Sequence, residues 1–129
     1  MTKLAMPKID RKLLARKEKI IISLKKIIKP ENVLYNEDQI RPYETDALSA
    51  YKQKPLIVVF PENTEEVSKI LKFCNNEKIK VIPRGAGTGL SGGALPLADG
   101  VLLCLGKFNK IINIVFKNKC VVAQPGVTN

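Results

Sequence analysis

Apolar side chains follow two different spacings along the chain, one before residue 30 and another after residue 55. In the first part they recur at helical intervals, so the sequence predicts a helix that Asp10 caps and that ends near residue 29, before Pro30. The side chains expected on its buried stripe are Leu13, Ile20, Leu24, Ile27 and Ile28. Residues 30–55 show no clear period and contain Pro42 and Pro55, which predicts an ordered connector.

The second part begins with an uninterrupted apolar run at residues 56–60, which is typical of a strand buried on both faces. A capping pattern at Thr64 then predicts a helix whose apolar face includes Ile70, Leu71 and Cys74. The order strand, helix, strand predicts a right-handed crossover and a parallel pair. The predicted elements in chain order are a strand at 56–60, a helix at 64–77, strands at 81–82 and 101–105, and a hairpin of 111–115 with 120–123.

Together these elements predict an α/β fold, α+β overall, in which an N-terminal helix precedes a small parallel β-α-β sheet and an antiparallel hairpin. We expect two regions: residues 1–54 with the helix and connector, and residues 55–129 with the main domain. The chain stops at residues 125–129 without a closing element, which is more typical of a fragment than of a complete domain.

The net charge of +10 is concentrated near the N-terminus. Residues 1–30 carry ten basic and two acidic side chains, so the remaining 99 residues contribute only +2. A solvated helix face is the simplest interpretation, and peripheral contact with an anionic membrane surface is the alternative. The segment has no aromatic residues to stack on bases, so we expect no nucleic-acid partner.

The chain has three cysteines and no histidine, and the cysteines form no CxxC pair, so we expect no metal site. Cys104 and Cys120 flank apolar runs and are expected to be small core residues. Unpaired cysteines and the lack of an evident signal peptide predict a cytoplasmic location. The longest apolar runs have five residues, whereas a membrane-spanning helix needs about 20.

Five glycines lie within nine residues, at positions 85, 87, 89, 92 and 93. Such a cluster forms either a sharp turn or a loop whose backbone N–H groups approach an anion. The segment matches GxGxxG, but Pro96 and Gly100 interrupt the helix that a dinucleotide-binding Rossmann loop must open. The P-loop pattern is also excluded, because Gly93-Ala94 stands where it requires lysine and a hydroxyl residue.

Residues 83–96 (PRGAGTGLSGGALP) closely resemble the FAD-binding segment of the PCMH-type, or vanillyl-alcohol-oxidase-like, flavoproteins. More narrowly, the sequence resembles the group of glycolate oxidase flavoprotein subunits and D-lactate dehydrogenases. The resemblance extends over residues 41–129. It includes the further segments 43–47, 49–51, 55–61, 64–74 and 124–127.

The resemblance implies that the loop wraps the FAD pyrophosphate with backbone amides. The residues implied to bind the cofactor are Arg84, Gly85, Ala86, Gly87, Thr88, Gly89, Ser91, Gly92, Gly93, Pro125 and Gly126. Arg84 has two open roles, either offsetting phosphate charge or bracing the loop. Binding is expected to be non-covalent, because Thr88 stands near the place where some relatives attach FAD to a histidine.

The resemblance also implies a reaction in which a 2-hydroxyacid becomes a 2-oxoacid and transfers a hydride to the flavin. The flavin then passes electrons to another acceptor, with further subunits as candidate partners. The family's catalytic residues belong to segments that follow Asn129, so residues 1–129 alone are expected to be inactive. The competing hypothesis is a non-catalytic nucleotide-binding or membrane-peripheral module.

Overall fold

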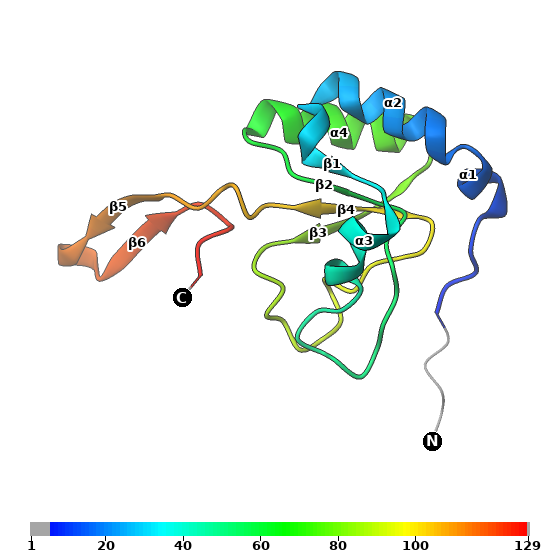
Figure 1. Cartoon of the computed structure of the whole chain (residues 1–129). Helices are drawn as coiled ribbons and strands as arrows, with labels where there is room; N and C mark the ends of the chain where they lie inside the picture. The colour runs from blue at the N-terminus through cyan, green and yellow to red at the C-terminus, as the bar shows by residue number, and fades with distance from the viewer. Residues whose placement is uncertain (1–5, 129) are drawn as a thin grey trace.

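A mixed sheet with helices forms the body of the molecule, and a two-stranded hairpin extends from it (Figure 1). The computed structural model describes residues 6–128. The helices in this range are α1 (Arg11–Ala15), α2 (Lys17–Ile27), α3 (Glu37–Ile40) and α4 (Thr64–Asn76), with 3-10 turns at Pro30–Asn32, Arg41–Tyr43 and Phe116–Asn118. The strands are β1 (Val33–Leu34), β2 (Ile57–Val59), β3 (Lys80–Arg84), β4 (Gly100–Cys104), β5 (Ile111–Val115) and β6 (Cys120–Ala123).

The N-terminal helix forms where the sequence predicts it, but it is interrupted at Arg16. Asp10 caps its start, with Oδ1 accepting from the backbone N–H groups of Lys12 and Leu13. Arg16 has a non-helical backbone and pairs with Glu77 at the end of α4. The predicted stripe is confirmed, because Leu13, Ile20, Leu24 and Ile28 are buried and Ile27 packs against them.

The four-stranded sheet has the order β1-β2-β4-β3. Strands β2 and β3 are parallel, as predicted, but each pairs with β4 rather than with the other. Strand β4 takes the place between them because all five of its residues are buried, and a central strand is covered on both faces. Strand β1, from the predicted connector, adds to the β2 edge in antiparallel orientation.

The two faces of the sheet are covered differently. Helices α2 and α4 lie over one face, where Ile57 and Val101 belong to the main core (Figure 1). Ile40 of α3 and the half-buried Tyr43 pack on the other face with Leu102. This second face is covered by short segments of the connector, and the carbonyl of Thr45 in the connector accepts from Arg84 at the end of β3.

Two details of α4 differ from the predictions. Asn63 caps the helix, with its side chain accepting from the N–H of Glu66, so Thr64 is the first helical residue instead of the cap. Leu71, expected on the buried face, is 44% exposed, whereas Ile70 and Cys74 are fully buried. The core-facing stripe is therefore narrower than predicted, and Leu71 lies outside it.

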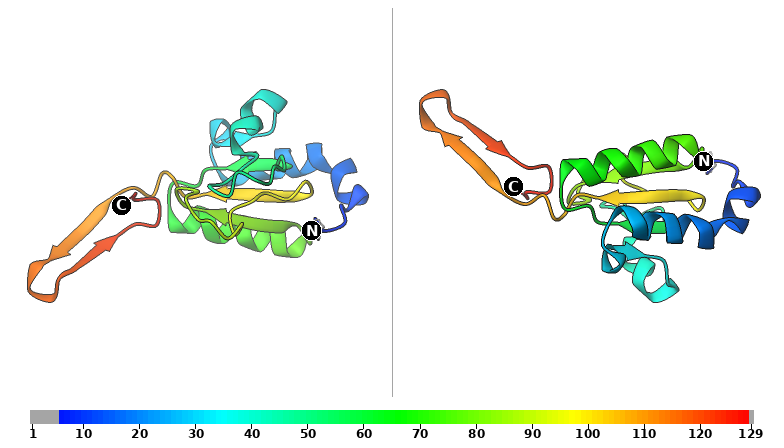
Figure 2. Two further views of the ribbon diagram at one scale, coloured as in Figure 1. Left: turned by 90° about the horizontal axis from the view of Figure 1, so that it is seen from below. Right: turned by 90° about the horizontal axis from the view of Figure 1, so that it is seen from above.

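Strands β5 and β6 form the predicted hairpin, and Lys119 in the turn adopts a left-handed backbone with φ of 51°. The hairpin points away from the body in the views of Figure 2. Its large apolar side chains are exposed, with Phe116 at 83%. Cys120, predicted to be a core residue, is exposed, because the hairpin has no second layer within residues 6–128. Cys104 is buried, as predicted.

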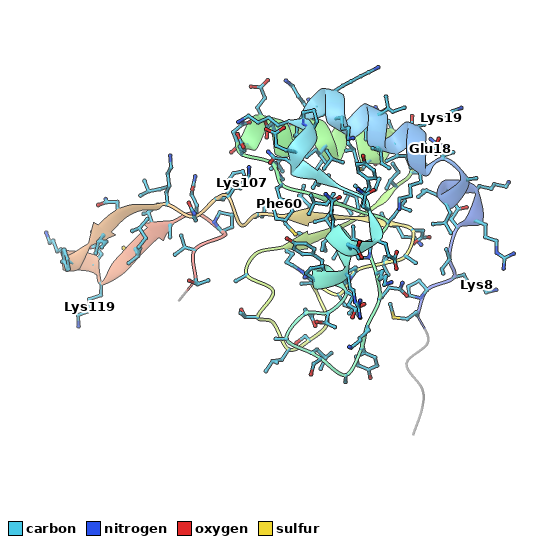
Figure 3. The ribbon with its side chains drawn as sticks, in the orientation of Figure 1. Lys8, Glu18, Lys19, Phe60, Lys107 and Lys119 are labelled. Carbon is cyan, nitrogen blue, oxygen red and sulfur yellow. The ribbon has the colours of Figure 1, made fainter. Side chains whose placement is uncertain are left out.

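A cluster around Glu62 ties three segments together near the base of the hairpin. Glu62 accepts from Lys29, Asn32 and Lys107 at 2.8, 3.1 and 2.8 Å, and the Lys107 ammonium also reaches Asn32 at 2.8 Å. Hydrogen bonds from Lys107, Lys29 and Asn32 lower the pKa of Glu62 to about 2. Lys107 lies in the link between β4 and β5, at the position labelled in Figure 3, so the cluster fixes the start of the hairpin.

Candidate functional site

The glycine-rich loop starts at the carboxyl ends of two parallel strands. Arg84 ends β3 and pairs with Cys104, which ends β4, and the N–H of Leu105 donates to the carbonyl of Arg84 at 2.8 Å. Residues 85–99 leave this edge and return to the other end of the sheet, where Gly100 begins β4. Ligands of open α/β sheets bind outside the carboxyl ends of the strands, so this loop occupies the expected place for a site.

Two carbonyls of the loop backbone accept hydrogen bonds from backbone N–H groups, whereas its own N–H groups stay without acceptors within residues 6–128. The carbonyl of Gly87 accepts from the N–H of Ala47 at 2.9 Å, and the carbonyl of Gly92 accepts from Leu95 at 3.1 Å. By contrast, the N–H groups of residues 85–94 donate no hydrogen bond to any acceptor within residues 6–128. A run of unbonded amides in a glycine-rich loop at a sheet edge is a suitable binding surface for an anion.

Two of the glycines are required by the backbone itself. Gly87 and Gly92 have φ values of 73° and 74°, a region that residues with a side chain rarely adopt. At Gly89 and Gly93, by contrast, an added Cβ would meet nothing within 4 Å. These two positions are also exposed, so the space beside them is open.

The segment that follows the hairpin returns to the same edge. An added Cβ at Gly85 would lie 2.9 Å from the carbonyl oxygen of Pro125, and one at Gly126 would lie 2.2 Å from the carbonyl oxygen of Leu105. The N–H of Gly126 donates to Phe108 at 2.8 Å. The structure therefore brings together the two predicted parts of the site, the loop and Pro125-Gly126, by direct backbone packing.

Arg84 lies beneath the loop and contacts the connector. Its residue exposure is 8%, and its Nη2 donates to the carbonyls of Ala94 and Thr45 at 2.7 and 2.8 Å. A longer contact of 3.4 Å reaches the carbonyl of Tyr43. These contacts match the bracing role that the sequence analysis left open for Arg84. A Cβ placed on Gly87 would lie 3.7 Å from Nε of the same side chain.

The guanidinium has uncharged neighbours. Burial raises the pKa of the Cys104 thiol to about 11, although the charge of Arg84 opposes the shift. Burial also raises the pKa of the Tyr43 phenol above its usual value of 10.0, so both groups are neutral at pH 7. Within residues 6–128, no carboxylate oxygen lies within 4.0 Å of Arg84, and Nε has no hydrogen-bond partner. Asp46, also 8% exposed, follows the accepting carbonyl of Thr45: its Oδ1 accepts from the N–H of Leu48 at 2.9 Å, and its Oδ2 has no hydrogen-bond partner among the described residues, as is the case for Nε of Arg84.

The remaining predicted positions lie on the outer side of the loop. Ala86, Thr88 and Ser91 are exposed, and their amides donate no hydrogen bond to an acceptor within residues 6–128. The connector, residues 43–48, was missed as part of the site, although residues 43–47 belong to the resemblance. The only signal in its sequence was that match, because it contributes backbone carbonyls and one backbone N–H. In the described part of the chain, no group of histidine, cysteine or acidic residues could hold a metal ion.

This arrangement can bind and orient an anionic group, but it offers no general base. The chain contains no histidine, and the two thiols near the sheet, Cys74 and Cys104, are buried with pKa values of about 11. The donors at the loop are neutral amides and hydroxyls above a buried cation. Such a set suits a phosphate or pyrophosphate more than a single metal ion.

Comparison with known proteins agrees with this geometry. The FAD binding domain family matches residues 55–129. The glycolate oxidase subunit GlcD of Escherichia coli is 42% identical over 125 residues, which is 97% of this chain and 24% of that protein. The D-lactate dehydrogenase of Anaerostipes hadrus is 40% identical over 103 residues, which is 79% of this chain and 22% of that protein.

A solved structure of p-cresol methylhydroxylase with substrate bound has a similar fold, with a TM-score of 0.73 and 29% identity. The match covers 93% of this chain and 24% of that chain. The chain thus spans about a quarter of the length of the proteins that it resembles. The predicted PCMH-type fold and the predicted resemblance to glycolate oxidase and D-lactate dehydrogenase are confirmed by these matches.

Proposed function

This chain belongs to the FAD binding domain family, and we propose that its glycine-rich loop holds the pyrophosphate of FAD within a flavin-dependent 2-hydroxyacid dehydrogenase. The observation that carries the proposal is the run of free amides at residues 85–94, at the carboxyl end of parallel strands. FAD carries a pyrophosphate with two negative charges, and this loop offers donors without an acidic side chain.

The residues fit the group in shape as well as in charge. Left-handed backbone at Gly87 and Gly92 curves the loop, while Gly89 and Gly93 leave space where a phosphate could approach the amides. We propose that residues 85–89 and 91–93 bind the pyrophosphate through N–H groups, with hydroxyls from Thr88 and Ser91. Pro125 and Gly126 form the adjacent wall of the same site.

FAD, when bound, supplies the redox chemistry, because it accepts a hydride from the substrate and passes electrons on. The share of this chain is to bind and orient the cofactor. No histidine is present to take the substrate's proton, so we propose that the proton acceptor belongs to another part of the whole protein. The attachment of FAD to this chain is proposed to be non-covalent for the same reason.

The substrate and partners are taken from the similar proteins. Glycolate oxidase and D-lactate dehydrogenase are named for small 2-hydroxyacids, and we propose a substrate of that class. The E. coli protein is named as a subunit, which supports a role for further polypeptides around this chain as well. We also propose that residues 55–129 form the FAD-binding domain, with residues 1–54 as its N-terminal extension.

A second candidate role is peripheral contact with an anionic membrane surface. Within residues 6–128, no helix is long and apolar enough to cross a bilayer. Exposed apolar side chains at Met6, Ile9, Leu14 and Ile22 alternate with basic ones along the N-terminal segment, which favours an interfacial position. Lys8 and Lys19 lie at the end of the molecule opposite Lys119 of the hairpin (Figure 3).

The flavin experiment tests the main proposal directly. Purified protein is mixed with FAD, separated from free flavin and precipitated with acid, and flavin absorbance is measured in both fractions. We expect flavin to be retained before precipitation and released completely into the supernatant afterwards. Protein that retains no flavin would contradict the FAD site, and flavin in the pellet would contradict non-covalent attachment.

Dye reduction with glycolate or D-lactate separates the dehydrogenase from a non-catalytic binding module. We expect turnover from the protein with its further segments or subunits, but not from residues 1–129 with saturating FAD.

For the membrane role, vesicles with anionic lipid should bind the chain, and neutral vesicles should not. Exchanging Lys19 and Lys26 for Gln should weaken that binding by about 30-fold, at roughly 1 kcal/mol per charge. The same exchange at Lys117 and Lys119, on the hairpin, is the matched control.

A further inference from the structure

Arg84 is a buried cation with no acidic partner among the described residues. Its exposure is 8%, and no carboxylate oxygen of residues 6–128 lies within 4.0 Å of it. Buried charges in proteins are normally paired, because removing an ion from water is costly unless another charge or several hydrogen bonds replace the water. The carbonyls of Thr45 and Ala94 provide hydrogen bonds, but they provide no negative charge.

The position of the cation relative to the loop is specific. Gly87 folds back over the Arg84 side chain, so that an added Cβ would lie 3.5 Å from its Cδ. At the far end of the loop, the carbonyl of Ala94 accepts from Nη2 at 2.7 Å. Gly87 near the start of the loop and Ala94 near its end thus both contact the Arg84 side chain. The N–H groups of residues 85–94 donate no hydrogen bond to an acceptor within residues 6–128.

The connector completes the support. Thr45 accepts from Arg84, and two residues later Ala47 donates its N–H to the carbonyl of Gly87. Gly92, at the second left-handed position, faces Leu48, because an added Cβ would lie 3.6 Å from its Cδ2. The loop is therefore held at three points by residues 45–48 and by Arg84.

From these contacts we infer that Arg84 is a positioning residue: it holds the loop in its anion-binding shape before the cofactor arrives, and the cofactor pyrophosphate adds a negative charge that no carboxylate of residues 6–128 provides within 4.0 Å of the guanidinium. The role of the pyrophosphate rests on the proposed function. The role of Arg84 in holding the loop concerns the chain without any ligand. Because the guanidinium is covered by the loop, it acts on the anion through the loop and through space rather than as an exposed binding group.

The first test measures the loop shape in the chain without FAD. The amides of Ala47 and Leu95 donate to carbonyls inside the loop, so their hydrogen exchange reports whether the loop is held. We expect Arg84→Gln and Arg84→Lys to speed exchange at both amides, because neither side chain can reproduce the planar guanidinium between two carbonyls. Arg11→Gln, an exposed arginine on α1, should leave both rates unchanged.

The second test separates charge from shape by comparing FAD with riboflavin, which lacks the pyrophosphate. We expect Arg84→Gln to weaken FAD binding by roughly 10- to 100-fold, the range for one charge-assisted interaction, with little effect on riboflavin. Arg84→Lys should keep the salt dependence of wild-type FAD binding while losing part of the affinity. The thermal midpoint of each variant shows whether it is folded, and Arg84→Lys remains informative if Arg84→Gln does not fold.

The outcomes are distinct. Unchanged exchange at Ala47 and Leu95 in both Arg84 variants would overturn the positioning role. An equal loss of FAD and riboflavin affinity would overturn the counter-charge. If the wild-type chain binds no FAD at all, the proposed function fails, while faster exchange in the variants would still establish Arg84 as the residue that holds the loop.

Discussion

One added methyl group at Gly126 should separate the two parts of the site, the glycine-rich loop and the Pro125-Gly126 segment. A Cβ there would lie 2.2 Å from the carbonyl oxygen of Leu105 and 2.8 Å from that of Phe108. Ordinary contacts start near 3.4 Å, so the turn must move by roughly 1 Å against backbone of the link between β4 and β5. The movement also lengthens the hydrogen bond from the Gly126 N–H to Phe108, now 2.8 Å.

The expected cost follows from these two terms. Overpacking of this kind costs about 1–3 kcal/mol, and the lost hydrogen bond adds about 1 kcal/mol. Because residues 124–128 lie in no helix or strand, we expect most of this free energy to appear as local opening of that segment. Pro125 then moves away from Gly85, and FAD affinity should fall by about 10-fold or more.

The assay for Gly126→Ala combines an FAD titration with hydrogen exchange at the amide of residue 126. Gly106→Ala is the matched control. Gly106 lies in the link between β4 and β5 that Gly126 contacts, and an added Cβ there meets nothing within 4 Å. We expect the control to resemble the wild type in both measurements. If Gly126→Ala is indistinguishable from Gly106→Ala, the close packing of Gly126 against Leu105 and Phe108 has no role in FAD binding.

Three further predictions concern other parts of the chain. Gly87→Val should abolish FAD retention, because a β-branched residue disfavours the φ of 73° at this position, while the circular dichroism of the sheet should be preserved. Thr88→Ala should be milder and cost about 1.5–3 kcal/mol of FAD binding free energy. The pKa of Glu62, about 2 in the folded chain against an ordinary 4.5, means that its partners stabilise the fold above pH 4.5 and that this stability is lost as the pH falls toward 2. Glu62→Gln should therefore lower the urea midpoint at pH 7 and flatten its change between pH 4.5 and 2; an equally steep change would refute the assignment. Because the hairpin exposes large apolar side chains, we expect the chain to self-associate and the exchange of Ile112 and Phe116 for Ser to reduce the particle size in light scattering; an unchanged size would contradict this role of the hairpin.

Local patterns predicted the elements well because each pattern depends on neighbours in sequence. The strand at 56–60, the helix after Asn63 and the hairpin all follow from apolar spacing and capping within a few residues. The order of the sheet could not be predicted in this way. The insertion of β4 between β2 and β3 depends on contacts between strands that are distant in sequence, because Val101 pairs with Ile57 on one side and with Val81 on the other.

The site was predicted to the extent that glycine reports backbone geometry. Gly87 and Gly92 have the left-handed conformation that their residue type suggests, and Gly85 and Gly126 lie at close approaches. The connector was missed because it supports the loop with backbone groups of Thr45 and Ala47, which any residue type could provide. The roles of the individual cofactor-binding residues stay predictions.

The division of the chain between residues 54 and 55 also stays a prediction, and the contacts across it affect how the domain should be tested. Residues 45–48 lie on the N-terminal side of that division, yet they hold the loop at Gly87 and accept from Arg84. Strand β1 and helix α2 from the same side supply part of the sheet and the main core. A shortened chain that begins at residue 55 would lose these contacts and expose the apolar residues beneath α2. Failure of such a shortened chain to bind FAD would therefore reflect the loss of loop support and core packing, so the loop must be tested by single substitutions in the full chain.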